Sequence, residues 1–325
     1  MSVSHFVIGT AGHIDHGKTE LVKALTGIDT DRLLEEKRRG ISIEIGFASF
    51  FLPEGLEVSI VDLPGHERFV KNMLAGSTGI DLLLLVVAAD DGVMAQTIEH
   101  LAIAELLDVR VAVVAITKID MVDEDRLQEV ETEVSELLKK SIFIKAPVVK
   151  VSAKTKVGLD NLVTAIEDET GNISERPIDL PPRIPIDRSF TIKGSGRVIT
   201  GTLWSGVLTT SGPLELLPSG KNVRPRKIEV RGQKVSKALA GQRVAINIVI
   251  TGEPPHRGDV LVAPATFALV DEIIAQVKVL PSASAALGKR KRLRLFHGTK
   301  EVAATLTPIT GRQIVPGQTA YARIH

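Results

Sequence analysis

The chain has 325 residues, enough for two or three domains that each bury a hydrophobic core. It contains no cysteine, which excludes disulfides and thiolate metal sites and fits a reducing compartment. The most apolar stretch, residues 82–89, is far shorter than the ~20 residues that a membrane helix needs, and the first residues lack a secretory signal pattern. We therefore expect a cytoplasmic protein without a membrane segment.

The net charge of +1 conceals two halves of opposite sign. Residues 1–175 hold 17 Lys+Arg and 30 Asp+Glu, a balance of −13, whereas residues 176–325 hold 23 and 9, a balance of +14. A basic half favours a polyanionic partner. The alternative is a solvated basic surface that has no partner.

The first half alternates short apolar runs with segments of helical periodicity. This pattern predicts an α/β domain over residues 1–175, with a doubly wound and mostly parallel sheet. The expected strands are 5–9, 46–51, 57–62, 82–88, 111–116 and 147–151. The expected helices are 18–26, 66–75, 96–107, 124–140 and 158–169.

The alternation ends at the proline-rich segment 177–182, where we place the first domain boundary. Short runs cut by Gly and Pro then predict an antiparallel β-barrel over residues 176–267. Its expected strands include 190–193, 197–203, 213–217, 226–230 and 243–250. Further strand-like runs predict a second β-barrel domain over residues 268–325.

A phosphate-binding loop of the form G-x-x-x-x-G-K-[ST] spans Gly12 to Thr19, directly after an apolar run. Glycines let backbone N–H groups surround phosphate oxygens, Lys18 reaches the β and γ phosphates, and Thr19 places a hydroxyl on Mg²⁺. The alternative is a glycine-rich turn that happens to precede a helix. The candidate phosphate-binding residues of this loop are Gly12, His13, Asp15, His16, Gly17, Lys18 and Thr19.

Two further segments carry candidate residues for the metal and the γ-phosphate. Asp62 ends a strand and can hold Mg²⁺ through water, and Gly65 can approach the γ-phosphate as only glycine permits. Ser42 can complete the Mg²⁺ shell when the γ-phosphate is present, although a strand-edge serine is the alternative. His66 is the candidate catalytic residue, placed to orient the attacking water.

Two strand ends carry candidate base-binding residues. Asp120, in Thr117-Lys118-Ile-Asp120, can accept two hydrogen bonds from guanine that adenine cannot supply. The segment Ser152-Ala153-Lys154 follows another strand and can contact the guanine carbonyl. Such strand ends form the ligand-binding edge of α/β sheets, so we expect GTP and GDP, rather than ATP, as cofactors together with Mg²⁺.

These motifs resemble the translational GTPases of the elongation factor Tu class. The resemblance rests on the phosphate loop, Arg39-Gly-Ile-Ser-Ile43 and Asp62-Leu-Pro-Gly-His66, and on the barrel segment 194–201. Within the class the chain resembles the selenocysteine-specific elongation factors. Segments 26–32, 36–40 and 45–48 carry this resemblance, as does Thr117 in place of the usual Asn.

The resemblance implies a factor that carries selenocysteinyl-tRNA to the ribosome in its GTP state and hydrolyses GTP on delivery through His66. It implies that Ile14 and Ile41 form an apolar gate beside this histidine. It also implies a selenocysteyl pocket made by Glu44, Arg188 and Arg243 between the first domain and the barrel. Arginines there would favour an ionised selenol over a neutral serine hydroxyl, whereas the alternative for each is a surface ion pair.

The basic segments of the second half fit tRNA phosphates, although lysines and arginines also protect strand edges. They are residues 221–237 and 289–295. The family binds an mRNA hairpin through a carboxyl-terminal extension, which we do not find here, and its third barrel is longer. We therefore expect residues 268–325 to form an incomplete barrel with open strand edges that pack poorly or are covered by another chain. A general aminoacyl-tRNA carrier and a non-translational GTPase subunit are the alternative functions.

Overall fold

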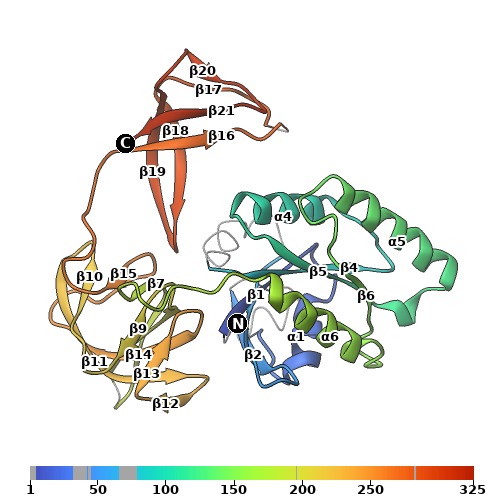
Figure 1. The fold of residues 1–325 in the computed structure, drawn as a ribbon, viewed down its shortest axis with the longest axis horizontal. Helices are drawn as coiled ribbons and strands as arrows, with labels where there is room; N and C mark the ends of the chain where they lie inside the picture. Colours follow the sequence, from blue (N-terminus) through green and yellow to red (C-terminus); the bar gives the residue numbers. More distant parts are fainter. Residues whose placement is uncertain (1–4, 32–41, 43–44, 66–78, 195, 282) are drawn as a thin grey trace.

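The computed structural model describes residues 5–31, 42, 45–65, 79–194, 196–281 and 283–325 (Figure 1). The helix predicted at 66–75 lies outside these residues. The strands of the first domain are β1 His5–Ala11, β2 Gly46–Phe51, β3 Glu57–Asp62, β4 Leu82–Ala88, β5 Val111–Thr117 and β6 Val148–Lys150. Its helices are α1 Lys18–Thr26, α4 Ala95–Leu106, α5 Glu124–Lys139 and α6 Leu159–Glu169, with short 3₁₀ turns at Ile119–Met121 and Thr170–Asn172.

The six strands form one sheet in the order β2-β3-β1-β4-β5-β6. All neighbours are parallel except β2, which is antiparallel to β3, so the predicted α/β class is confirmed. Helices α4 and α5 cover one face and α1 and α6 the other (Figure 1). Because both faces are covered, every residue of β4 is buried, which explains its continuous apolar run.

Alternation along β1 distributes its side chains between the two cores. Val7 and Ala11 pack under α4 and α5, while Phe6 and Ile8 pack against α1 and α6. On α5, Leu127, Val130, Val134 and Leu138 form the buried stripe expected at helical spacing. Asp123 is the N-cap of the helix, and its carboxylate accepts a hydrogen bond from the Arg126 amide.

The second domain is a closed antiparallel barrel. Its strands are β7 Arg183–Ile192, β8 Gly196–Thr202, β9 Val207–Thr209, β10 Leu214–Leu217, β11 Lys221–Val230, β12 Gln233–Val235, β13 Lys237–Leu239, β14 Arg243–Val249 and β15 Val260–Val262. The sheet has the strand order β10-β15-β7-β8-β14-β11, and it closes into a barrel because β10 also pairs with β11. Alternate residues of these strands fill the interior, among them Ile184, Ile199, Val223 and Ile246.

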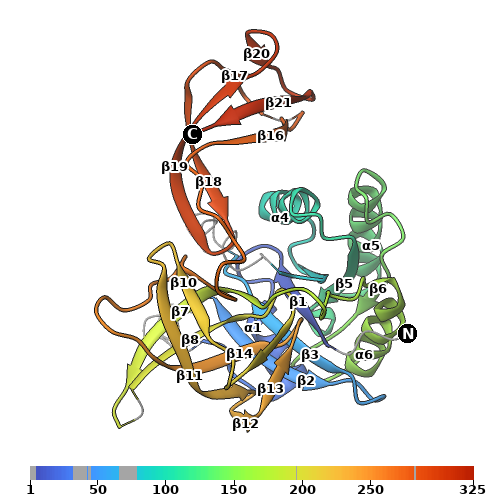
Figure 2. The ribbon, with the colours of Figure 1, turned by 60° about the vertical axis from the view of Figure 1, so that its left-hand side comes forward.

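The third region holds β16 Ile273–Lys278, β17 Leu287–Gly288, β18 Lys291–His297, β19 Lys300–Pro308, β20 Gln313–Ile314 and β21 Thr319–Ile324. A four-stranded sheet in the order β16-β21-β19-β18 lies beside the β17–β20 pair. The region stands away from the α/β domain, and its β18–β19 hairpin reaches back toward the barrel (Figures 1 and 2). At the hairpin tip, the Thr299 hydroxyl donates a 2.6 Å hydrogen bond to the Ile186 carbonyl.

None of the helices in the described ranges has the length and apolar character needed to cross a membrane.

Candidate functional site

The phosphate loop connects the buried end of β1 to the start of α1. Gly12 has a φ of +136°, and a Cβ there would lie 2.1 Å from the carbonyl oxygen of Val86. Gly17 precedes the helix with a φ of +79°, a conformation that favours glycine. The turn therefore requires both glycines and directs the positive end of α1 at the loop.

Lys18 reaches back across the loop and is almost fully buried. Its ammonium donates to the carbonyl oxygens of His13 and, at 3.2 Å, of Gly12. Burial lowers the pKa of Lys18 to about 8. A Cβ at Gly65 would come within 2.4 Å of this ammonium and 2.9 Å of the Ile14 amide, so only glycine fits there. The described part of the chain thus brings Gly65 against the loop, where the γ-phosphate of a bound nucleotide is expected.

Hydroxyl and carboxylate groups gather beside the loop. Asp62 accepts hydrogen bonds from Thr19 at 2.8 Å and from Thr10 at 2.7 Å. The hydroxyls of Thr19 and Ser42 lie 2.9 Å apart. Thr10 was not predicted, and neither were two members from another segment: Thr30 donates to Asp62 at 2.6 Å, and Asp31 accepts from Ser42 at 2.7 Å. The only sequence signal for Thr30 and Asp31 was the polar run that follows the first helix.

This cluster fits a magnesium ion. Thr19 donates its proton to Asp62 and Ser42 donates its proton to Asp31, so the two hydroxyl oxygens turn lone pairs toward each other. Their 2.9 Å separation matches two adjacent ligands of an octahedron with bonds of about 2.0–2.1 Å. No cluster of three or more His, Cys, Asp or Glu that suits a metal occurs among the described residues.

The candidate base-binding residues come together at the ends of β5 and β6. Asp120 accepts a 2.6 Å hydrogen bond from Ser152, and this bond lowers the pKa of Asp120. Ser152 also accepts from the Thr155 amide at 3.1 Å, which shapes the turn that carries Ala153 and Lys154. A carboxylate is thus fixed and ionised at the edge of the sheet, as hydrogen bonding to guanine would require.

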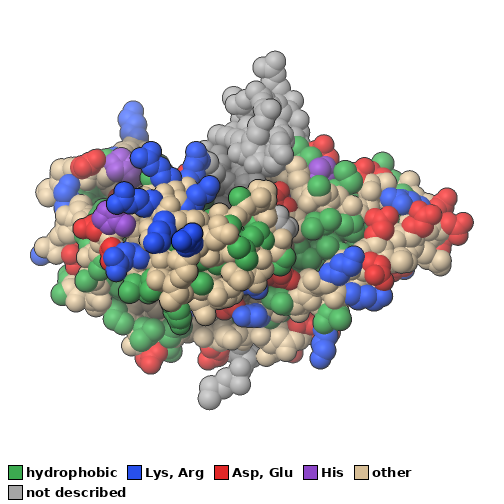
Figure 3. Space-filling model, turned by 90° about the horizontal axis from the view of Figure 1, so that it is seen from above, with side chains coloured by type: hydrophobic (Ala, Val, Ile, Leu, Met, Phe, Trp, Pro, Cys, Tyr) green, Lys and Arg blue, Asp and Glu red, His purple; other side chains and the backbone are tan. Residues whose placement is uncertain are grey.

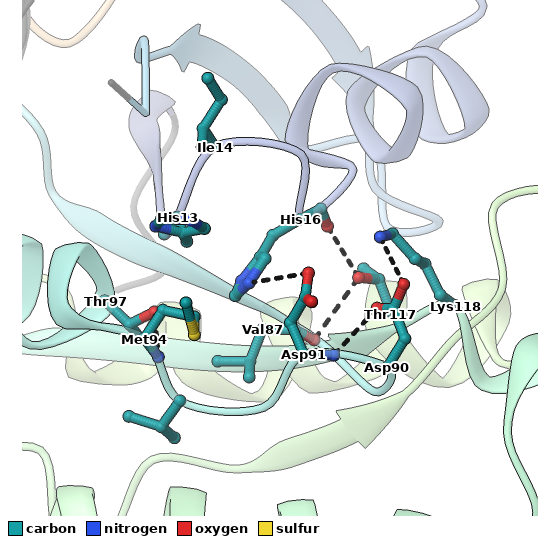
Figure 4. Close-up of polar contacts among 12 residues, drawn as sticks. His13, Ile14, His16, Val87, Asp90, Asp91, Met94, Thr97, Thr117 and Lys118 are labelled. Carbon is teal, nitrogen blue, oxygen red and sulfur yellow. Dashed lines mark hydrogen bonds and ion pairs between the residues drawn. The ribbon is translucent and has the colours of Figure 1, made fainter. Parts of the chain in front are cut away.

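The side chain of Thr117 makes its hydrogen bonds within the protein. Its hydroxyl is buried and donates a 2.7 Å hydrogen bond to the carbonyl of His16 in the phosphate loop (Figure 4). Lys118, whose φ is +57°, forms a 2.8 Å ion pair with Asp90 (Figure 4). The structure therefore gives Thr117 a role in holding the phosphate loop, and its contact with guanine stays a prediction.

Two side chains of α4 that were not predicted from the sequence also hold the phosphate loop. The Gly12 amide donates to Nδ1 of His100 and the Ile14 amide donates to Gln96, each at 3.0 Å. Burial lowers the pKa of His100 to about 4, so the ring is neutral and accepts this bond. The i, i+4 spacing of Gln96 and His100 was the available signal, because it places both on one helix face.

The histidines of the loop supply no positive charge to a phosphate. His16 is fully buried, its Nδ1 lies 3.3 Å from the Val86 carbonyl, and burial lowers its pKa to about 4. Burial and the nearby Lys18 also lower the pKa of His13. The two rings meet edge to face with centroids 5.1 Å apart (Figure 4). Phosphate contacts from these residues would therefore come from their backbone.

A second candidate site lies where β2 meets the barrel. The guanidinium carbons of Arg243 and Arg188 lie 3.5 Å and 4.8 Å from the ring centroid of Phe47. Arg243 also forms a 2.8 Å ion pair with Asp187, and Arg188 donates to the Ile45 carbonyl. The structure thus brings together two of the three predicted pocket residues.

A cavity of about 380 Å³ opens at this junction, large enough for an aminoacyl group. Its lining is rich in basic side chains, with Asp187 as its carboxylate. The lining residues are Ile45, Phe47, Asp187, Arg188, Ser189, Phe190, Arg197, Pro254, Pro255, His256 and Arg257. The predicted residues Ile41, Glu44 and His66 lie outside the described part of the chain.

The surface charge follows the division seen in the sequence. In Figure 3, Lys and Arg gather over the β-domains, and Asp and Glu dominate the opposite end, formed by the α/β domain. Basic residues of β11, such as Arg224, Arg226 and Lys227, are exposed.

The α/β fold and the phosphate loop define a P-loop nucleotide-binding domain joined to β-barrels. Residues 3–171 match the family described as elongation factor Tu GTP binding domain. The chain is 44% identical over 320 residues to the selenocysteine-specific elongation factor of Desulfomicrobium baculatum, covering 98% of this chain and 50% of that protein. This chain spans about half the length of such curated relatives.

Solved structures agree with these matches. A bacterial selenocysteine-specific elongation factor superposes with a TM-score of 0.89 at 34% identity, covering 99% of this chain and 53% of that one. The elongation factor SelB of Methanococcus maripaludis, solved with the GTP analogue GppNHp, superposes with a TM-score of 0.85 at 30% identity, covering 100% and 72%. The chain belongs to the selenocysteine-specific elongation factors, a family of translational GTPases.

Proposed function

We propose that this protein binds GTP with Mg²⁺, carries selenocysteinyl-tRNA to the ribosome and hydrolyses GTP on delivery. The observation that carries the proposal is the position of a cationic, aminoacyl-sized cavity directly beside the nucleotide domain, at its junction with the barrel. Family membership supports the same cargo. Elongation factors of this class couple cargo binding to a nucleotide, and here Ser42 lies three residues before Ile45 of the cavity wall.

Different residues of the site would bind the phosphates, the base and the metal ion. Backbone amides of the loop and Lys18 bind the phosphates, while Asp120 with the Ser152 turn binds guanine. Thr19, Ser42 and, through water, Asp62 would hold Mg²⁺, which neutralises phosphate charge when it is bound. His66 is the proposed residue that orients the attacking water, with Ile14 and Ile41 as its apolar gate.

Cargo selection would depend on charge. A selenol is ionised near neutral pH, whereas a serine hydroxyl is neutral, and the cavity is lined by Arg188, Arg197 and Arg257. Coulomb attraction increases where water is excluded, so the arginines favour the ionised group. Glu44 is the third proposed member of this selenocysteyl pocket. The exposed basic side chains of β11 would bind tRNA phosphates, which position the tRNA without reading its sequence.

The test compares selenocysteinyl-tRNA and seryl-tRNA made on the same tRNA body, each with GTP and with GDP. We expect GTP-dependent binding with a clear preference for the selenocysteinyl form. Equal affinity for both would indicate a general aminoacyl-tRNA carrier. Absence of tRNA binding by a chain that binds GTP would favour a regulatory GTPase without tRNA.

Catalysis is tested separately with His66→Ala. This change should leave the dissociation constant for GTP nearly unchanged, because a water-orienting side chain contributes little to ground-state binding. It should slow ribosome-stimulated hydrolysis in single-turnover assays. Hydrolysis at the rate of the unaltered protein would refute the proposed role of His66.

A further inference from the structure

One aromatic ring contacts both arginines of the candidate selenocysteyl pocket. Phe47 lies on β2, the edge strand of the α/β sheet, and its ring lies 3.5 Å from Arg243 and 4.8 Å from Arg188, measured to the guanidinium carbons. The two arginines come from different barrel strands, β14 and β7. Both cationic side chains therefore contact the same ring of the nucleotide domain.

Each arginine is held in a second direction by a hydrogen-bonding partner. Arg243 pairs with Asp187 at 2.8 Å and contacts the Thr202 hydroxyl at 3.3 Å. Arg188 donates to the carbonyl of Ile45, two residues before the ring. A long arginine side chain has many rotamers, so two such constraints are needed to fix the plane of a guanidinium group.

Fixed charge is what anion selection requires. Where cations can move away or bring water with them, the preference for an anion over a neutral hydroxyl becomes smaller. The negative face of an aromatic ring attracts a guanidinium group without neutralising its charge, unlike a carboxylate. Phe47 and Arg188 both line the cavity, so the ring can orient this guanidinium group without neutralising it. Arg243 pairs with Asp187 and does not belong to the lining.

We propose that Phe47 is a positioning residue for cargo selection: its ring, which also contacts the Asp187-paired Arg243, holds the guanidinium group of Arg188 in the cavity wall, so that the cavity prefers an ionised selenol to a neutral hydroxyl. This proposal rests on the proposed function. Phe47 also packs against the core under α4 and α5, so a merely structural role is the alternative that an experiment must separate.

The chain offers a matched control on the same strand. Phe51, four residues further along β2, also stacks on a barrel arginine, with the guanidinium carbon of Arg231 4.1 Å from its ring. It does not belong to the lining of the cavity. Phe51→Leu therefore removes an equivalent contact between the domains without disturbing the pocket.

The experiment measures, with GTP bound, the ratio of the dissociation constants for seryl-tRNA and selenocysteinyl-tRNA. Phe47→Leu should lower this ratio about tenfold, which corresponds to about 1.4 kcal/mol and lies within the range of a desolvated cation–π contact. Phe47→Tyr keeps the ring and should keep the ratio of the unaltered protein, as should Phe51→Leu. The affinity for GTP should stay the same in every variant.

Fluorinated phenylalanines at position 47 supply a second test, independent of any folding defect in Phe47→Leu. They keep the shape of the ring and progressively remove the negative charge of its face. A stepwise fall in the ratio with added fluorine supports the proposal. If Phe47 only packed, the ratio would not depend on the charge of its ring face. An unchanged ratio in the fluorinated series, or an equal fall in Phe51→Leu, overturns it while the proposed function stands. If the unaltered protein shows no preference, the cargo proposal fails and the role of Phe47 fails with it.

Discussion

The hydroxyl of Thr117 at the end of β5 donates a 2.7 Å hydrogen bond to the carbonyl of His16 in the middle of the phosphate loop (Figure 4). The two residues are 101 positions apart in the sequence. The bond joins the strand that leads to the guanine-binding residues directly to the loop that would bind phosphate. The Thr117 hydroxyl would therefore affect the binding of both the guanine base and the phosphates of a nucleotide.

Thr117→Val should weaken GTP and GDP binding to a similar extent, about tenfold. The substitution keeps the shape of the side chain but leaves the buried His16 carbonyl without its donor, at a cost of about 1–3 kcal/mol. Titration calorimetry measures both affinities. Thr117→Ser keeps the hydroxyl and serves as the control. Unchanged affinities in Thr117→Val would show that the bond does not shape the loop.

Asp120→Asn should reverse the preference for the base. The carboxylate of Asp120, held by Ser152 at 2.6 Å, accepts hydrogen bonds, whereas an amide also donates them. Loss of charge-assisted bonds should weaken GTP binding at least a hundredfold and improve the binding of xanthosine triphosphate, whose base carries a carbonyl in place of the amino group. Competition with a fluorescent guanine nucleotide checks this, and retained GTP affinity would contradict it.

His100 should make stability depend on pH. Burial lowers the pKa of His100 to about 4 from an ordinary value of 6.5, so between these values the unfolded chain binds a proton that the folded chain does not. Stability should therefore fall as the pH falls from 6.5 to 4, by on the order of 3 kcal/mol from this residue. Urea unfolding at several pH values should show a shallower dependence in His100→Gln. The exposed His256→Gln is the control, and equal slopes in all three proteins would contradict the assignment.

Glu57 should hold the α/β domain to the barrel. It is buried, forms a 3.2 Å ion pair with Arg231, accepts a 3.1 Å hydrogen bond from Gln242 and lies 3.3 Å from His5. Burial by itself raises the pKa of Glu57, but the bonds from His5 and Gln242 and the charge of Arg231 lower it overall. Removing one partner of a buried charge cluster costs about 3–5 kcal/mol.

In scanning calorimetry, Glu57→Ala should therefore lower the unfolding temperature and separate the unfolding of the two domains. Glu229→Ala removes a surface carboxylate of the barrel that pairs with Lys227, and should leave the transition almost unchanged. Equal behaviour of both variants would show that Glu57 does not connect the domains.

Much of the fold followed from local patterns. The spacing of apolar residues predicted the six strands and the four described helices of the first domain, whereas the helix predicted at 66–75 lies outside the described residues. The proline-rich segment 177–182 precedes β7, the first strand of the barrel. The pairing of β10 with β11, which closes the barrel, could not be predicted from the sequence. Register between strands depends on contacts that no short segment encodes. Thr30 and Asp31 were missed for the same reason: their role appears only when Asp62 and Ser42 are beside them.

The position of the phosphate loop was evident from eight consecutive residues, because the spacing of its glycines, lysine and hydroxyl sets the geometry of phosphate binding. The order of the motifs along the sequence also determined the class of protein. The packing of the folded chain was needed to show that Thr117 and His100 hold the loop and that Phe47 contacts both Arg188 and Arg243. These contacts join residues from separate strands and helices, and their distances depend on how whole elements pack rather than on any local preference.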